Sequence, residues 1–486
     1  MGRAVWLVIL AGAALRFATL DSQSLWFDEA ITAQLLRMDL FGLLHAIPDS
    51  ESTPPLYYLL GWTWSHVFGT GEAGLRSLPA LLGSATIGVV WALGRRLGGD
   101  RAGLIAAGLV AINPMLVWFS QEARAYSLLA LLAALSALLW LRALEQPRAV
   151  GRAALWSIVA ALAVATHYYA IFLVAPQALW LVWRACDARG RAAAIAPLGL
   201  ALAGLAPLAL HQRDNDNASF IRDSPLLTRV AQVPKQLLVG YDGPAETPLA
   251  VLSVLLLLIA LRGVWLLIAL SARGYAREDA LLLAGIAGAA LALPLLAALA
   301  GEDHLSTRNL LAVAPVGAAL AGAGLATLGE TMPSLARGAL AAACAIGVTT
   351  VAGVAVDPAL QRDDWRGAVR ALGHADGERV LVATPASALA PVRYYLPSAR
   401  KLTVPVLVTS EIDYIALPER SPGERPKPPR PAQPPQPVPG MVPAGQAQAQ
   451  TFTVLRLRSP AAKAVAAAEV VVGLDGKAAA ILVASR

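Results

Sequence analysis

The stretch ARAYSLLALLAALSALLWLRAL, residues 123–144, is long and apolar enough to cross a bilayer as one helix. Its charged residues, Arg124 and Arg142, lie near the two ends, and only Ala, Leu, Ser, Tyr and Trp stand between them. A helix needs about 20 apolar residues to cross the hydrocarbon core. Because a soluble core helix would keep a polar face, the stretch predicts a transmembrane helix.

Similar apolar runs recur over the first 355 residues, and the composition agrees with them. Of the 486 residues, 57% are hydrophobic and 15% are charged, against about 25% charged in average soluble domains. The expected fold class is an all-α polytopic membrane protein with about 11–13 transmembrane helices. The expected spans lie near 4–20, 74–97, 102–119, 123–144, 152–166, 168–184, 192–211, 248–270, 279–300, 308–328 and 335–355.

Two apolar stretches need separate interpretation. The first, Val5–Leu20, lacks a small-residue cleavage site and is therefore read as a retained helix, not as a removed signal peptide. The second, 54–69, is expected to lie in the membrane plane, to re-enter, or to share one crossing with the helix that follows it.

Arginine-rich links predict the orientation of the helices, since cytoplasmic loops collect Lys and Arg. The links contain Arg95, Arg96, Arg101, Arg142, Arg148, Arg152, Arg184, Arg189, Arg191, Arg273, Arg277 and Arg337. Placing them in the cytoplasm makes the N-terminus cytoplasmic and the C-terminal part extracytoplasmic. Orientation also accounts for the net charge of +7, and the dispersed basic residues argue against nucleic-acid binding. Cys186 and Cys344 are expected neither to pair nor to bind a metal.

The opposite face of the membrane collects acidic, His, Tyr and Asn side chains, so we expect the chemistry there. Its two long segments are 21–53, with amphipathic surface helices, and 213–247. The second exceeds the usual length of an unstructured connection, which indicates a functional or a disordered loop.

The residues from 356 to 486 have a different character and predict a small extracytoplasmic α/β domain after the membrane module of residues 1–355. The segments VLVAT (380–384), KLTVPVLV (401–408), TFTVLRL (451–457) and AEVVVGL (468–474) are typical of strands. Residues 363–375 are typical of an amphipathic helix. The Pro-rich insert, 417–450, is expected to be polyproline II or disordered.

Asp28 and Glu29, in SLWFDEA (24–30), are adjacent acids that follow the first apolar run. Acids at the start of a helix are favoured by its dipole, which is the structural reading. In the functional reading one carboxylate faces a cavity between helices and acts as a general base, its pKa raised by apolar walls.

A second set of candidates lies in SQEARAYSL (120–128). Glu122, Arg124 and Tyr126 are expected in the first turns of a span, as a helix cap or as a polar wall that binds a hydroxyl-rich substrate. Carboxylates on separate outer loops could share a divalent cation. Asp28 and Glu122 are the candidate ligands, and no cofactor is otherwise expected.

Aromatic and basic residues complete the candidates. His167 and Tyr168, in THYYA (166–170), fit an aromatic belt at the membrane surface or a substrate site. Arg308 begins an otherwise uncharged span near His304, where a guanidinium could reach the membrane surface or bind a phosphate.

Several segments, in this order, resemble the bacterial family 39 glycosyltransferases, relatives of protein O-mannosyltransferases and the lipid A aminoarabinose transferase. They are SLWFDEA, STPPLYYLLGWTWSHVFGTGEAGLRSLPALLG (52–83), ALGRRLGG (92–99), LIAAGLVAINPMLVWFSQEARAYSLLALL (104–132), HYY (167–169) and STRNLLAVAP (306–315). The resemblance covers about residues 5–330 and continues loosely into QRDDWRGAVRAL (361–372).

The resemblance implies a C-type glycosyltransferase fold in the bacterial plasma membrane. It implies transfer, with inversion, of a sugar from a polyprenyl phosphate to a hydroxyl of a cell-envelope glycan, lipid or protein. By this similarity Asp28 is the base, Glu29 its neighbour, Glu122 a second acid and Arg308 a ligand of the lipid phosphate.

This chain departs from the family at two positions. Asn309 stands where the family often has Tyr, and Thr53 stands where it usually has His, so another histidine, such as His167 or His304, is a candidate to assist. A transporter or flippase of lipid-linked glycans is the first alternative function, and a membrane-anchored assembly protein is the second.

Overall fold

The structure, a computed structural model, describes residues 2–185, 187–270, 274–375, 377–384, 386–417, 438–471 and 480–484. The chain forms two compact units. The helical unit comprises Met1–Leu20 and Met38–Gly353, and the sheet unit comprises Asp21–Arg37 and Val354–Arg486. The predicted boundary at 355/356 lies close to the observed one. The prediction did not include that Asp21–Arg37, the segment with Asp28 and Glu29, groups with the C-terminal residues.

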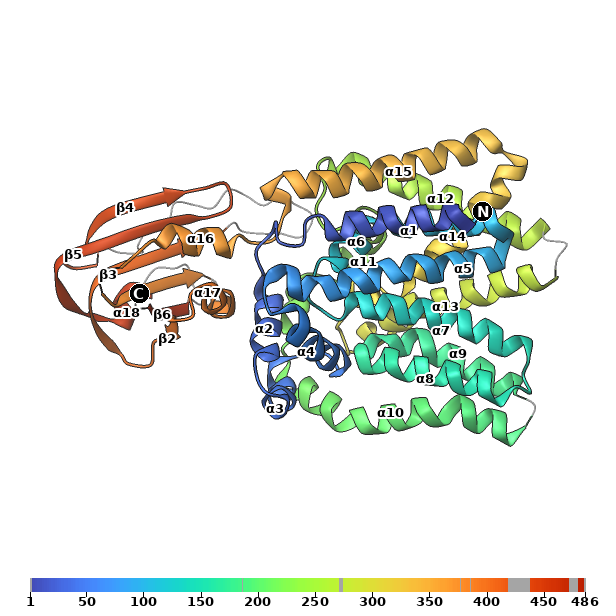
Figure 1. The fold of residues 1–486 in the computed structure, drawn as a ribbon, viewed down its shortest axis with the longest axis horizontal. Helices are drawn as coiled ribbons and strands as arrows, with labels where there is room; N and C mark the ends of the chain where they lie inside the picture. The colour runs from blue at the N-terminus through green and yellow to red at the C-terminus, as the bar shows by residue number, and fades with distance from the viewer. Residues whose placement is uncertain are drawn as a thin grey trace. The chain divides into compact units, whose positions relative to one another are not determined.

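The helical unit consists of α-helices joined by short links and 3₁₀ turns, and its long helices run side by side (Figure 1). The helices are α1 (Gly2–Phe17), α3 (Leu40–Ser50), α4 (Leu56–Phe68), α5 (Glu72–Ile112), α6 (Pro114–Ser120), α7 (Tyr126–Glu145), α8 (Val150–Thr166), α9 (Ile171–Arg184), α10 (Ala188–Asn215), α11 (Leu226–Val239), α12 (Glu246–Leu270), α13 (Gly274–Leu299), α14 (Val313–Thr331) and α15 (Pro333–Val356). The 3₁₀ turns are η1 (Tyr168–Ala170), η2 (Ser219–Asp223) and η3 (Thr307–Leu310).

The predicted helical membrane fold is confirmed. In the part of the chain that the structure describes, 7 helices are long and apolar enough to cross a membrane: α5, α7, α10, α12, α13, α14 and α15. The stretch predicted to lie in the membrane plane or to share a crossing is α4, whose 13 residues make a helix of about 20 Å. That length is short of the hydrocarbon thickness of about 30 Å.

α5 contains two of the predicted spans. Its backbone leaves the helical conformation at Gly98 and Gly99, where Gly99 has a φ of 78° that disfavours any side chain. A Cβ on Gly94 would lie 2.8 Å from the Cβ of Ala106. In a straight helix these residues would be about 18 Å apart, so the two halves of α5 fold back on one another.

The second half of α5 ends at Ile112, before the end of its predicted span at 119, because Asn113 and Pro114 begin α6. The carbonyl groups in the last turn of a helix have no partner within it. The buried guanidinium of Arg16 is the partner of two of these carbonyls: Nη1 donates to Ala111 O at 2.9 Å and Nη2 donates to Val110 O at 3.0 Å.

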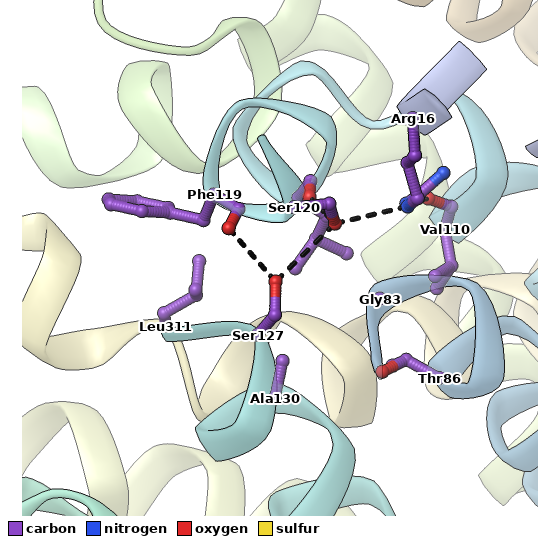
Figure 2. Close-up of a pocket in the computed structure, with 10 residues that line it drawn as sticks. Arg16, Gly83, Thr86, Val110, Phe119, Ser120, Ser127, Ala130 and Leu311 are labelled. Carbon is purple, nitrogen blue, oxygen red and sulfur yellow. Dashed lines mark hydrogen bonds between the residues drawn. The ribbon is translucent and has the colours of Figure 1, made fainter. Parts of the chain in front are cut away.

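Arg16 also ties α1 to α6, because its Nε donates to Ser120 Oγ at 3.1 Å (Figure 2). Ser127 Oγ in turn donates to Phe119 O at 2.9 Å. These side chains line a cavity of about 10 Å³, close to the volume that one water molecule needs. The polar groups inside this helix packing are therefore bonded to one another.

The segment 213–247 is more ordered than the predicted loop. It contains η2 and the 14-residue helix α11, which follows Pro225 and ends at Gly240, where φ is 91°. Cys344 is exposed on α15, and Cys186 lies outside the described residues.

The sheet unit is a 6-stranded sheet with the strand order β2-β6-β1-β3-β5-β4. The strands are β1 (Arg379–Thr384), β2 (Arg400–Lys401), β3 (Val406–Ala416), β4 (Val442–Gln448), β5 (Thr453–Ala466) and β6 (Ala480–Ala484). β1 pairs with β3 in parallel, and the other pairs are antiparallel. The helices of this unit are α2 (Phe27–Leu36), α16 (Trp365–Leu372), α17 (Leu389–Tyr395) and α18 (Ala467–Val471), with 3₁₀ turns η4 (Pro358–Leu360) and η5 (Ala386–Ala388).

Alternate residues of β1 enter two separate cores. Leu381 and Ala383 pack with residues of α16 and α17, whereas Val380 and Val382 pack on the other face with β3 and β5. This is the period of two that a strand imposes, and it confirms the strand and the helix predicted over 380–384 and 363–375.

Three predictions for this unit are wrong in part. Val442–Gln448, inside the predicted insert 417–450, is β4 and pairs with β5, while 418–437 lie outside the described residues. The strand predicted at 468–474 begins as helix α18, and 472–474 lie outside the described residues. The strand predicted at 401–408 is divided between β2 and β3, and Pro405, which cannot donate a ladder hydrogen bond, stands between them.

Close contact between α12 and α14 yields a test of the helical unit. A Cβ on Gly324 would lie 2.6 Å from Val264 N, whereas a Cβ on Gly317, on the same helix, would meet nothing within 4 Å. We expect Gly324→Ala to lower the free energy of unfolding by about 1–3 kcal/mol through overpacking. Thermal unfolding in detergent measures this. Gly317→Ala is the control, and an equal effect of both substitutions would contradict the packing.

Candidate functional site

The link between α6 and α7 carries Glu122 and Arg124. Both are buried and precede the helix, which begins at Tyr126. The prediction that they lie in the first helical turns is therefore wrong, because α6 ends at Ser120 and residues 121–125 form a turn. A turn leaves these side chains free to point away from the helix axis toward other links.

A buried ion pair joins this link to the segment before α4. Arg124 Nη1 lies 2.8 Å from Glu51 Oε1, and the two side chains are 9% and 3% exposed. The same guanidinium lies 5.8 Å from the ring centroid of Tyr58, whose hydroxyl is 3.0 Å from Thr53 Oγ1. Arg124 is thus held between a carboxylate and an aromatic face.

His167 lies between α8 and η1 and is also buried. Its Nδ1 accepts a hydrogen bond from Tyr169 N at 3.2 Å. Burial, together with the positive charges of Arg308 and Arg124, lowers the pKa of His167 to about 3, against a hydrogen bond with Asn309 that raises it. At neutral pH the imidazole is uncharged, with its proton on Nε2.

Arg308 lies in η3 and not at the start of a span, since α14 begins only at Val313. Its guanidinium is 5.0 Å from the ring centroid of Phe220. The next residue, Asn309, donates to His304 O at 2.8 Å. Both residues act on His167, Arg308 through its positive charge and Asn309 through a hydrogen bond.

We call Glu51, Arg124, His167 and Arg308 the polar cluster. It combines three predicted site residues with one that we did not predict as a site residue, Glu51. The predicted Tyr126 lies beside it, with its ring centroid 5.8 Å from that of His167. Each member comes from a link or a 3₁₀ turn between helices.

Two predicted residues join the cluster less directly. Tyr168 donates from its hydroxyl to Gln212 Oε1 at 2.8 Å, and Gln212 Nε2 donates to Thr53 O at 3.3 Å. His304 contributes its backbone carbonyl to Asn309. Burial raises the pKa of the Tyr168 hydroxyl to about 12, so this side chain stays a neutral donor.

Sequence reasoning passed over Glu51, Tyr58 and Asn309 as site residues. Glu51 directly precedes the STPPLYY motif and Tyr58 is its last residue, but Asp49 is a second acid at this point and no local signal singles out Glu51. Asn309 was noted as a departure from the family, and its contact with His167 gives that position a structural role.

Asp28 and Glu29 belong to the sheet unit. Both lie in the first turn of α2, Asp28 partly exposed and Glu29 buried. Thr32 Oγ1 donates to Asp28 O at 3.0 Å and reinforces that turn. The position agrees with the helix-dipole reading and leaves the catalytic reading a prediction.

Among the residues that the structure describes, no group of three or more His, Cys, Asp or Glu side chains could hold a metal ion. Asp28 and Glu122, the predicted ligands of a divalent cation, belong to different units. A cation shared between them stays a prediction.

Breaking the buried Arg124–Glu51 ion pair should lower the stability of the folded protein by a measurable amount. We expect Glu51→Gln to lower the free energy of unfolding by about 3–5 kcal/mol, because Arg124 would remain buried without its counter-charge. Glu145→Gln is the control, since Glu145 is 44% exposed and its partner Arg96 keeps a second acid, Asp279, at 2.7 Å, so we expect a loss of at most about 1 kcal/mol. Denaturant unfolding in detergent compares the two variants. Losses of the same size would contradict the burial of the Glu51 pair.

The low pKa of His167 predicts a pH dependence of stability. Between about 3 and the ordinary value of 6.5 the unfolded chain binds a proton at this site and the folded chain does not. Stability must therefore fall as pH falls through this window, by at most about 1.4 kcal/mol per pH unit from this residue.

Thermal unfolding from pH 4 to pH 8 measures the effect, and His167→Gln should reduce the slope. The exposed His66 gives the control, His66→Gln, which should keep the wild-type slope. An unchanged slope in His167→Gln would show that His167 takes up its proton in the folded state.

The sequence pattern of the dolichyl-phosphate-mannose-protein mannosyltransferase family matches residues 52–211. This part of the chain contains Arg124, Tyr126 and His167. Among curated proteins, none matches the sequence significantly.

The solved structures that are similar to this chain include the following two. One is ArnT from Cupriavidus metallidurans bound to undecaprenyl phosphate, with 18% identity, a TM-score of 0.45 and coverage of 66% of this chain and 60% of that chain. The other is the archaeal oligosaccharyltransferase AglB from Archaeoglobus fulgidus in complex with an inhibitory peptide and a dolichol-phosphate, with 14% identity, a TM-score of 0.48 and coverage of 76% and 57%. The chain therefore spans less than two thirds of the length of these proteins.

The match over residues 52–211 agrees with the resemblance predicted from the order of the motifs.

Proposed function

We propose that this protein is a membrane glycosyltransferase that moves a sugar from a polyprenyl-phosphate donor to an acceptor hydroxyl, with inversion at the anomeric carbon. The observation that carries the proposal is a pair of arginines, the buried Arg124 and Arg308, whose positive charges both act on the buried His167. The family match supports it, because two of these residues lie within the matched segment.

The polar cluster has the chemistry to bind a phosphate. Guanidinium groups donate in a planar fork that fits phosphate oxygens. Arg124 is oriented by Glu51 at 2.8 Å, and Arg308 is held over Phe220. His167 lies beside these cations without a charge of its own, and its ring is held by hydrogen bonds with Tyr169 N and Asn309. A lipid phosphate monoester in this place would meet donors on several sides.

In the proposed reaction Asp28 takes the proton of the acceptor hydroxyl as that oxygen attacks the anomeric carbon. The new bond joins the acceptor oxygen to this carbon, and the bond from the carbon to the phosphate oxygen breaks. The electron pair leaves with the lipid phosphate, whose acidity removes the need for a strong general acid. Positive groups stabilise its charge, and Glu29 and Glu122 are the neighbouring acids that support binding. A divalent cation between Asp28 and Glu122 would supply further positive charge.

The location of the polar cluster favours transfer over transport. Transporters bind substrates near the bilayer midplane on broken helices, whereas the cluster consists of links and turns at helix ends. With the arginine-rich links in the cytoplasm, these ends face outward. The acceptor would be a glycan, lipid or protein of the bacterial cell envelope, and the sheet unit would be extracytoplasmic.

The role of Asp28 is tested by transfer from labelled polyprenyl-phosphate sugars to cell-envelope acceptors. We expect Asp28→Asn to lower the rate about 100- to 10,000-fold, which is the usual contribution of a general base. Asp21→Asn is the matched control, because Asp21 is an exposed acid of the same segment.

Undiminished transfer by Asp28→Asn would remove this residue as the base. Movement of the lipid-linked sugar across vesicles without any transfer by the wild type would instead support a flippase.

A further inference from the structure

The segment that carries Asp28 is hydrogen-bonded to the C-terminal residues of the sheet unit on both sides of the acid. Before it, Leu25 N donates to the hydroxyl of Tyr395 at 2.6 Å. After it, Gln34 Nε2 donates to Ala390 O at 3.0 Å. Asp28 therefore lies between two fixed points.

These two points belong to one helix. Tyr395 ends α17, and Ala390 lies near its start. Because Leu25 meets the end of α17 and Gln34 meets its beginning, α2 and α17 run antiparallel. The contact at Leu25 precedes α2 and the contact at Gln34 lies about 10 Å along it from Phe27, so the two contacts are far enough apart to limit both sliding and tilting of α2. Arg37, after α2, adds a contact over the ring of Tyr394 at 4.6 Å.

The chain that leads into α2 is held by a second element, α16, and by the residues just before it. Ser24 Oγ donates to Asp363 O at 2.6 Å and accepts from Trp365 N at 3.1 Å. Arg366 donates to Asp21 O at 2.9 Å and to Ser22 O at 2.8 Å. The family resemblance continues into residues 361–372. These residues thus hold, by hydrogen bonds, the chain that leads into α2.

Both holding elements rest on a packed core. Trp365 and Leu372 of α16 and Val392 of α17 are buried in one hydrophobic cluster with β1 and β6, and the ring of Tyr395 packs against it. Side chains locked by packing hold their polar atoms in fixed positions. The Tyr395 hydroxyl is therefore a rigid acceptor for the backbone three residues before Asp28.

We propose that the C-terminal residues of the sheet unit position α2 for catalysis, with Tyr395 and Gln34 as positioning residues that act through Asp28. For its chemical consequence this inference rests on the proposed function. A base must be aligned with the proton that it accepts, and small displacements caused by remote substitutions can cost about 100-fold in rate.

Tyr395→Phe tests the proposal with little effect on packing, because it removes only the hydroxyl. Tyr414→Phe is the matched control: its hydroxyl donates to Val470 O at 3.1 Å in the same unit, away from residues 21–37. Gln34→Leu is a second variant at the other fixed point. Hydrogen exchange of peptides from residues 21–37 and steady-state transfer kinetics are measured on the full chain in detergent or nanodiscs.

We expect Tyr395→Phe and Gln34→Leu to speed exchange in residues 21–37 about 5- to 10-fold, since local hydrogen bonds set local opening. We expect each to lower kcat about 10- to 100-fold while KM for the donor changes less than about twofold, because the polar cluster is untouched. Tyr414→Phe should change none of these quantities.

Unchanged exchange in both variants would overturn the proposal, as would faster exchange with unchanged kcat. Equal losses in Tyr414→Phe would also overturn it by indicating general destabilisation. A wild-type protein without transfer activity would refute the proposed function, and the exchange data would then decide separately whether the C-terminal residues hold α2.

Discussion

Hydrocarbon offers no hydrogen-bond partners, so every backbone polar group within the membrane must be bonded inside the chain. This constraint produces the long helices and also determines where they can stop. α5 ends at Ile112 with its last carbonyls bound by the buried Arg16. Irregular backbone is tolerated where protein surrounds it, and the polar cluster is built from such links. The candidate site thus lies in links between helices, where the fold tolerates irregular backbone and polar side chains.

Within the polar cluster, neighbouring groups determine the charge state in which each buried side chain is stable. Arg124 is buried with Glu51 at 2.8 Å, which offsets part of the desolvation cost of both groups. His167 responds to the same surroundings in the opposite way: burial and two nearby arginines keep it neutral. A site with fixed cations and an uncharged imidazole is suited to bind an anion that arrives from the membrane, which is the chemistry of the proposed lipid phosphate.

Residue patterns predicted the helices and strands of this chain better than they predicted the contacts between distant side chains. The apolar run at 123–144 and the alternation at 380–384 became α7 and β1 because periodicity reports burial locally. Polar and aromatic residue types at the ends of the apolar runs predicted Arg124, Tyr126, His167 and Arg308 as site residues, and interactions with His167 connect them. Glu51 and Asn309 were missed as site residues because their roles depend on partners 73 and 142 positions away in the chain, which no local pattern encodes. β4 was missed because a Pro-rich neighbourhood conceals a strand that β5 stabilises.

The sequence by itself determined that the chain is a helical membrane protein with a small α/β unit, and it supplied the candidate site residues, since hydropathy and residue type are local properties. Only the tertiary structure decided that Asp21–Arg37 groups with the C-terminal residues, that Glu51 is the counter-charge of Arg124, and that His167 is neutral. The physical reason is that pairing, burial and pKa depend on groups brought together across long stretches of chain.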